Sequence, residues 1–283
     1  MRLSPPLHRI PGAVLCAVVG QPIAHSRSPT IHRLFAEQCG LALQYERLEV
    51  APGTLAEALA ALRALDCRGV NVTVPLKEEA AALAAARAPA VVAAGAANTL
   101  WWEGEAVSAA NTDGVGLLAD LVRNLGVTLR GRRILLLGAG GAAAGVIGPL
   151  LEAEPAELLI LNRNPARAES LRARFADDPR LGILRPGDAT GAWEVIINAT
   201  AAGLAGAGPA LPGGAVRPDT FCYDMGYGAE QTPFLRHCVT QGARRVADGL
   251  GMLVEQAAAA FALWHGRAPD SGPVLAALRT ALG

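Results

Sequence analysis

Six residues near the middle of the chain have the types and spacing that would bind a dinucleotide. They read Gly138-Ala139-Gly140-Gly141-Ala142-Ala143 and follow the apolar run 133–137, which predicts a buried strand. A G-x-G-x-x-A turn between a strand and a helix is typical of a dinucleotide-binding βαβ unit. There Gly138 would permit the tight turn, Gly140 would let the backbone approach a pyrophosphate, and Ala143 would allow close helix packing. The alternative is an ordinary glycine-rich loop.

The residues after the next predicted strand, 157–161, indicate which dinucleotide would bind. A site for NAD carries Asp or Glu here for the ribose 2′-hydroxyl, whereas this chain has Asn162-Arg163-Asn164-Pro165-Ala166-Arg167. Two guanidinium groups suit a 2′-phosphate, which they bind through charge-assisted hydrogen bonds. The alternative is that Arg163 and Arg167 are solvated surface residues, although cations are mildly unfavourable near the start of a helix. The pattern therefore favours NADP.

A second set of polar residues lies at predicted strand ends in the first 113 residues. The set comprises Ser26, Ser28, Thr73, Lys77, Asn98 and Asp113. Taken singly, each has a structural explanation: Ser28 before Pro29 could cap a helix, Asp113 could start a turn, and a lone lysine is usually solvated. Together they would bind a polyhydroxylated ring with a carboxylate, and Lys77 and Asp113 could move a proton beside a carbonyl that is being reduced.

The elements that must position these residues alternate between strand and helix throughout the chain. The pattern predicts a mostly parallel sheet in an N-terminal substrate domain and a second sheet in a Rossmann-type domain, with a cleft between two α/β domains. The strands expected are 13–19, 43–50, 69–74, 98–102, 133–137, 157–161, 195–198, 220–224 and 245–246. The helices expected are 29–38, 54–65 with Thr54 as its N-cap, 78–87, 111–125, 250–264 and 274–282.

Composition excludes several classes of protein. The 283 residues suffice for two domains, and the formal net charge of zero disfavours a nucleic-acid binder or a protein drawn to an anionic membrane. Charged residues, glycines or prolines interrupt every apolar run before it reaches the length of a membrane span, and the first 11 residues do not resemble a signal peptide. The five cysteines are scattered without a C-x-x-C pair. They indicate reduced, buried thiols in a cytoplasmic protein, and no metal site is expected.

The chain resembles the shikimate dehydrogenase family from about Ala13 onward. The motifs that carry the resemblance are Ser26-Arg27-Ser28-Pro29, Asn71 to Lys77, Gly95 to Thr99, Asn111 to Gly114, Gly138 to Ala142, Asn162 to Arg167, Asn198-Ala199-Thr200 and Asp248 to Leu253. The resemblance implies a substrate-binding and catalytic domain of residues 1–113 and 249–283, and a Rossmann NADP-binding domain of residues 114–248. One departure is Ala142-Ala143-Ala144, where many relatives have Ser or Arg.

The resemblance also implies an activity and a role for each residue. The activity is the reversible reduction of 3-dehydroshikimate to shikimate with NADPH, in aromatic amino-acid and chorismate biosynthesis. Ser26 and Ser28 would bind the substrate carboxylate, and Lys77 would be the acid/base group paired with Asp113. The residues that would hold ring hydroxyls are Thr73, Asn98, Asp113, Tyr227 and Gln256.

For the cofactor, the resemblance implies three groups of contacts. Gly138, Ala139, Gly140, Gly141 and Ala142 would surround the pyrophosphate. Arg163 and Arg167 would bind the 2′-phosphate, and Asn162 and Asn164 belong to the same part of the cofactor site. Met225, Gly249 and Met252 would line the nicotinamide site.

Two other functions remain open on the sequence. One is a quinate/shikimate dehydrogenase, which would share the fold and differ in one contact in the substrate pocket. The other is a non-catalytic protein that senses NADP, which would not need Lys77 or Asp113. We expect a small-molecule substrate, no nucleic acid, no membrane partner, and a monomer or homodimer.

Overall fold

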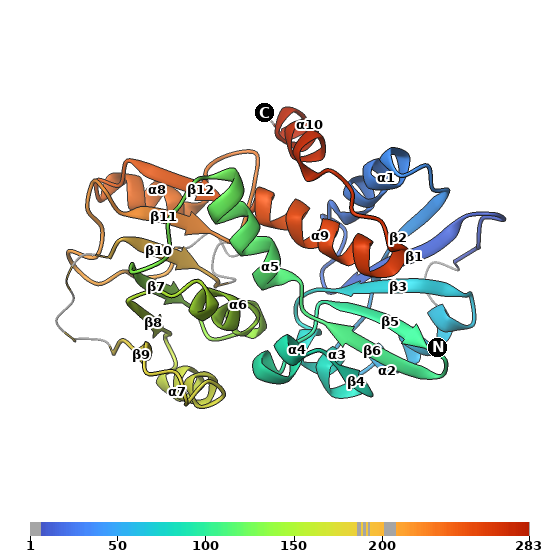
Figure 1. The fold of residues 1–283 in the computed structure, drawn as a ribbon, viewed down its shortest axis with the longest axis horizontal. Coiled ribbons are helices and arrows are strands. Elements are labelled where there is room, and N and C mark those ends of the chain that lie inside the picture. Colours follow the sequence, from blue (N-terminus) through green and yellow to red (C-terminus); the bar gives the residue numbers. More distant parts are fainter. Residues whose placement is uncertain (1–6, 186–187, 189–190, 192, 201–207, 283) are drawn as a thin grey trace. The chain divides into compact units, whose positions relative to one another are not determined.

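A computed structural model describes residues 7–185, 188, 191, 193–200 and 208–282 (Figure 1). The chain forms two compact units. The first comprises Met1–Asp113 with Val254–Ala277, and the second comprises Gly114–Leu253 with Leu278–Gly283. Each unit is an α/β structure with its own six-stranded sheet, which confirms the predicted fold class. No helix in the described ranges is both long and apolar enough to cross a membrane.

The sheet of the first unit has the strand order β2-β1-β3-β5-β6-β4. The strands are β1 (Val14–Gly20), β2 (Leu43–Glu49), β3 (Cys67–Val72), β4 (Ala86–Arg87), β5 (Thr99–Glu103) and β6 (Ala106–Ala110). β1 pairs with β2 and β3 in parallel, β4 pairs with β6 in parallel, and β5 runs antiparallel to both β3 and β6. The apolar side chains of β1 and β3 form a core with Leu55, Leu59 and Leu62.

Helices of the first unit follow most of these strands. They are α1 (Ser28–Gln38), α2 (Leu55–Arg63), α3 (Lys77–Leu83) and α4 (Pro89–Ala94), together with most of α9 (Leu250–His265) and of α10 (Ser271–Leu282). α1 begins one residue before the predicted start at Pro29, so Ser28 lies inside the helix and Arg27 is its N-cap.

One local prediction in this unit is wrong, and one is confirmed in position only. The helix expected over 78–87 ends at Leu83, and Ala86–Arg87 pair with β6. Pro89 disfavours helical backbone at the residue before it, and Ala88 is extended, with φ −60° and ψ 152°. The alanine-rich pattern was therefore overridden by strand pairing and by proline. Thr54 is the N-cap residue of α2, as predicted, but its hydroxyl donates to the carbonyl oxygen of Ala51 at 2.8 Å and makes no capping hydrogen bond.

The second unit contains an all-parallel sheet with the strand order β12-β11-β10-β7-β8-β9. The strands are β7 (Arg133–Leu137), β8 (Glu157–Leu161), β9 (Leu181–Ile183), β10 (Val195–Asn198), β11 (Phe221–Asp224) and β12 (Arg245–Asp248). The two central apolar runs are fully buried at Ile134, Leu135, Leu158 and Ile160, as expected for strands covered on both faces.

Helices connect the strands of the second unit. They are α5 (Asp113–Leu118), a π-helical turn η1 (Ala119–Asn124), α6 (Gly141–Glu152), α7 (Pro165–Ala173) and α8 (Pro233–Thr240). The predicted helix 111–125 is thus observed as α5 and η1 in succession. β9 and α8 are additional elements that the pattern did not predict.

Candidate active site

One edge of the first sheet gathers the predicted polar residues. β1, β3 and β6 end at Gly20, Val72 and Ala110, and antiparallel β5 begins at Thr99. Four segments therefore leave the sheet at this edge. They hold the two serines, Thr73 with Lys77, Asn98, and Asp113. In open α/β sheets the carboxyl ends of the parallel strands are where ligands bind.

Lys77 and Asp113 form an ion pair at this edge. Nζ of Lys77, the first residue of α3, lies 2.5 Å from Oδ2 of Asp113, the first residue of α5. Their side chains are only 11% and 6% exposed, so the pair is largely removed from water. A carboxylate is also favoured at the N-terminus of a helix, where the dipole is positive. The structure therefore holds an ammonium group and a carboxylate together at the place where the sequence predicted proton transfer.

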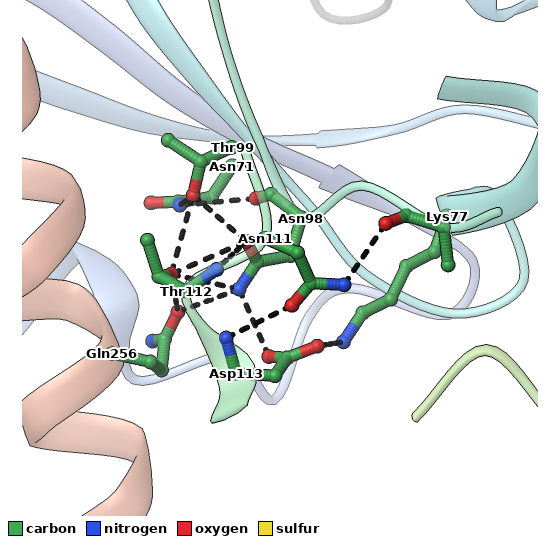
Figure 2. A network of polar contacts seen from close by, with 9 residues as sticks. Asn71, Lys77, Asn98, Thr99, Asn111, Thr112, Asp113 and Gln256 are labelled. Atoms are coloured by element: carbon green, nitrogen blue, oxygen red, sulfur yellow. Dashed lines mark hydrogen bonds and ion pairs between the residues drawn. The ribbon is translucent and has the colours of Figure 1, made fainter. Parts of the chain in front are cut away.

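Asn98 links this ion pair to helix α9 (Figure 2). Its Nδ2 lies 2.9 Å from Oδ1 of Asp113 and 3.2 Å from Oε1 of Gln256. Its Oδ1 accepts from the backbone N–H of Thr112 at 2.8 Å, which fixes the orientation of the amide. Four of the predicted site residues, Lys77, Asn98, Asp113 and Gln256, are thus joined in one hydrogen-bonded network.

Four further polar residues belong to the same network. They are Asn71, Thr99, Asn111 and Thr112, all nearly buried. Asn111 donates to the carbonyl oxygen of Ala96 and accepts from the backbone N–H of Asp113, so it fixes the start of α5. Asn71 is an amide inside the apolar strand β3, and a buried amide needs hydrogen-bond partners. That interruption of an apolar run was the signal in the sequence that could have identified it.

The serine pair and Thr73 lie at the same edge but are not hydrogen-bonded to Lys77 within the described part of the chain. Ser26 Oγ donates to Ser28 Oγ at 3.2 Å and accepts from the backbone N–H of Ser28 at 3.3 Å. Thr73 immediately follows β3, and its methyl group occupies the space beside Gly20, where a Cβ would lie only 2.5 Å away. The last residue of β1 must therefore be glycine for Thr73 to have this position.

The glycine-rich turn of the second unit fits a dinucleotide. Gly138 has φ +110°, which favours glycine, and a Cβ there would lie 3.2 Å from the carbonyl of Ala199. Gly140 is different, because its φ of −98° suits any residue and a Cβ would meet no atom within 4 Å. Neither backbone conformation nor internal packing requires that glycine, whereas close approach of a pyrophosphate to the backbone would. Ala143, in the first turn of α6, is fully buried.

The segment after β8 presents the two predicted arginines to solvent. Asn162 donates to the carbonyl oxygen of Asn164, and the Asn164 side chain caps α7 by accepting from the N–H of Ala166 at 3.1 Å. Arg163 and Arg167 are exposed, and no hydrogen bond or ion pair to another described residue engages either guanidinium group. Both cations are therefore available to an anionic ligand at the carboxyl end of β8.

The remaining predicted residues also lie in the second unit. Met225 follows β11, and Gly249 approaches it so closely that a Cβ at 249 would be 2.3 Å from the Met225 carbonyl oxygen. Met252 is buried in the first turn of α9. Tyr227 is partly buried and belongs to the second unit.

Comparisons with known proteins match almost the whole chain. Three family models match: the shikimate dehydrogenase substrate binding domain over residues 18–100, shikimate/quinate 5-dehydrogenase over 119–205, and the shikimate 5′-dehydrogenase C-terminal domain over 249–279. A curated shikimate dehydrogenase (NADP(+)) from Alkalilimnicola ehrlichii is 50% identical over 263 residues, covering 93% of this chain and 97% of that protein. Another from Bordetella petrii is 50% identical over 274 residues, covering 94% and 95%.

Solved structures give the same result. The shikimate 5-dehydrogenase of Thermus thermophilus in complex with shikimate has a TM-score of 0.82 and 35% identity, over 95% of this chain and 99% of that one. A shikimate dehydrogenase in complex with NADP+ has a TM-score of 0.83 and 28% identity, with 96% of both chains covered. A 5-ketofructose reductase of Gluconobacter also shares the fold, with a TM-score of 0.79 and 28% identity over 96% of this chain and 99% of that one. On the identity and coverage of the curated relatives, the chain belongs to the shikimate dehydrogenase family.

Proposed function

We propose that this protein catalyses the reversible reduction of 3-dehydroshikimate to shikimate with NADPH, a step of aromatic amino-acid and chorismate biosynthesis. The observation that carries the proposal is the buried ion pair of Lys77 and Asp113, tied through Asn98 to Gln256. Curated relatives with half of their residues identical bear the name shikimate dehydrogenase (NADP(+)). A protein that only senses NADP would have no use for such a pair.

The first unit binds the substrate in this proposal. The hydroxyls of Ser26 and Ser28 bind the carboxylate, and their mutual hydrogen bond keeps both on the same loop. The ring hydroxyls need both donors and acceptors, which amide, hydroxyl and carboxylate groups supply. The residues assigned to them are Thr73, Asn98, Asp113, Tyr227 and Gln256.

Lys77 and Asp113 handle the proton. In the reducing direction negative charge develops on the carbonyl oxygen, and Lys77 Nζ donates a proton to it. In the oxidising direction Lys77 takes the proton back. The Asp113 carboxylate, 2.5 Å from Nζ, fixes the position of the ammonium group, while Asn98 holds the other carboxylate oxygen.

The second unit binds the cofactor. NADPH supplies the hydride when bound, and the protein positions it. The turn of Gly138, Ala139, Gly140, Gly141 and Ala142 receives the pyrophosphate at the N-terminus of α6. Arg163 and Arg167 bind the 2′-phosphate beside Asn162 and Asn164. Met225, Gly249 and Met252 line the nicotinamide site.

The test is a spectrophotometric assay of the purified protein. Oxidation of shikimate with NADP should give absorbance of the reduced nicotinamide, and quinate or NAD should give much lower kcat/KM. Comparable rates with shikimate and quinate would instead identify a quinate/shikimate dehydrogenase. NADP binding without turnover of either acid would reject an enzyme of this class.

The cytoplasmic location and the monomeric or homodimeric state are further proposals. All five cysteines are free thiols and four of them are buried, which supports the first. Fractionation of the native cells and size-exclusion chromatography with light scattering would test them.

A further inference from the structure

Tyr45 is not one of the predicted site residues, but its side chain is hydrogen-bonded to the network around Asn98 through Asn71. Tyr45 lies on the edge strand β2 and pairs in register with Cys16 of β1. Its hydroxyl is 2.6 Å from Oδ1 of Asn71 on β3, the strand on the other side of β1. The phenol therefore spans a neighbouring strand, and the small side chain of Cys16 leaves room for the ring in the cluster that they share.

A continuous chain of hydrogen bonds runs from Tyr45 to Lys77. Asn71 Nδ2 donates to Thr99 Oγ1 at 3.3 Å, Thr99 Oγ1 donates to Asn98 Oδ1 at 2.9 Å, and Asn98 Nδ2 donates to Asp113 Oδ1 at 2.9 Å. Lys77 then donates to the other oxygen of Asp113 (Figure 2). Asn71, Thr99 and Asn98 are each at most 5% exposed, so water does not compete for their polar atoms.

The donor and acceptor groups in this series of hydrogen bonds are fixed at Asn98 and at Asn71. At Asn98 the backbone N–H of Thr112 requires an acceptor, so Oδ1 must face it. Asn71 Nδ2 lies 3.2 Å from the backbone carbonyl oxygen of Asn98. A carbonyl oxygen can only accept a hydrogen bond, so the NH₂ group of Asn71 must face it. Asn71 Oδ1 is consequently turned to Tyr45, whose hydroxyl must donate. Without that donor a buried amide oxygen would lose a partner, which is more costly than the gain from an average hydrogen bond.

The aromatic neighbours of Tyr45 hold its ring in place. The imidazole of His32 on α1 stacks on it with 4.3 Å between centroids, and Trp264 of α9 stacks on His32 at 5.5 Å. Gly69 makes this possible, because a Cβ there would lie 2.2 Å from the indole of Trp264. Burial raises the pKa of the Tyr45 phenol well above its ordinary value, so the hydroxyl keeps its proton across the working pH range.

We propose that Tyr45 is a positioning residue: its hydroxyl fixes the amide of Asn71 and, through Thr99 and Asn98, orients the Asp113 carboxylate that holds Lys77. The inference rests on the proposed function, because its readout is shikimate turnover. Neither Tyr45 nor Asn71 carries a role in the proposed mechanism above.

The experiment is a double-mutant cycle with Tyr45→Phe, Asn71→Ala and the double variant. Loss of one buried hydrogen bond should lower kcat/KM for shikimate about threefold to tenfold in Tyr45→Phe, while KM for NADP changes less than twofold. If Tyr45 acts through Asn71, the double variant should be no worse than Asn71→Ala alone. Because the His32 imidazole also interacts with the Asn71 side chain, and could donate to it once the phenol hydroxyl is removed, Tyr45→Phe is also made in a His32→Phe background.

Phe35→Leu is the matched control for packing. Phe35 is fully buried and contacts His32 edge-on in the same aromatic cluster, but it has no polar atom. The Phe35→Leu variant should have a lower melting temperature than wild type, with kcat/KM for shikimate within twofold of the wild-type value.

Three results would overturn the inference. The first is kcat/KM unchanged by Tyr45→Phe in both backgrounds, the second is additive effects in the cycle, and the third is an equal fall in kcat/KM in Phe35→Leu. A wild-type protein that does not oxidise shikimate would instead reject the proposed function, and the two failures are therefore distinguishable.

Discussion

At the scale of single residues, Lys77 and its surroundings decide the chemistry. It is the only lysine in the chain, its side chain is 11% exposed, and it forms an ion pair with the Asp113 carboxylate. Lys77→Ala should lower kcat by roughly 10² to 10⁴, the usual contribution of a general acid/base group. Binding of shikimate, measured by calorimetry, should weaken far less. A variant with near-normal kcat would require a different proton donor.

Ser26 should behave differently from Lys77, because it binds and does not react. Ser26→Ala removes a hydrogen bond to a charged group, worth about 1.5–3 kcal/mol, so KM for shikimate should rise more than kcat falls. Ser108→Ala is the control, since that hydroxyl is buried on β6 without a hydrogen-bond partner among the described residues. Loss of kcat at unchanged KM in Ser26→Ala would contradict the assignment to the carboxylate.

At the scale of elements, the β8 to α7 connection should set cofactor preference. The double variant with Arg163→Ala and Arg167→Ala should bind NADP more weakly, by about a hundredfold or more, because each charge-assisted contact is worth about 1.5–3 kcal/mol. NAD has no 2′-phosphate, so its binding should hardly change. Arg163→Asp should go further by repelling the phosphate and accepting from the NAD ribose.

Fluorescence titration of both cofactors tests these variants. Arg172→Ala, in the last turn of α7, is the control, since its guanidinium donates to the Leu181 carbonyl. A parallel loss of NAD and NADP affinity in the double variant would assign the arginines to the pyrophosphate or to folding.

The same elements show what a sequence can and cannot predict. β7, β8 and the turn between β7 and α6 were predictable, because a buried strand and a glycine turn have local signatures. β4 was not, because Ala86 and Arg87 have no strand pattern and pair only once β6 is in place. Tyr45 was missed for a related reason: its hydrogen bond to Asn71 joins strands on either side of β1, and nothing local to residue 45 indicates it.

At the scale of the whole molecule, the buried His32 and the partly buried His265 should make the stability of the fold sensitive to acid. Burial lowers the pKa of His32 to about 3 and that of His265 to about 4, below the ordinary value of 6.5. Below pH 6.5 the unfolded chain takes up protons that the folded state does not, so the free energy of unfolding falls as the pH falls toward these values. For His32 the loss between pH 7.5 and 5.5 is about 1.4 kcal/mol.

Urea denaturation of wild type and His32→Phe at both pH values measures this loss. The variant keeps an aromatic ring between Tyr45 and Trp264 but does not titrate. Its stability should therefore depend less on pH, by about 1.4 kcal/mol over the interval. An identical pH dependence in the two proteins would mean that His32 is protonated in the folded state.

The single lysine also makes the protein suitable for amine chemistry. Reductive methylation with ¹³C-formaldehyde would label only the α-amino group and Lys77, so a carbon NMR spectrum would contain a signal from the ε-amine of the site itself. The two amines are separable, because their ordinary pKa values differ by about 2.5. Shikimate should slow labelling of Lys77 alone. Formaldehyde usually labels many lysines of a protein at once. Here the rate at which it labels Lys77 would report the fraction of protein that has shikimate bound, without any substitution.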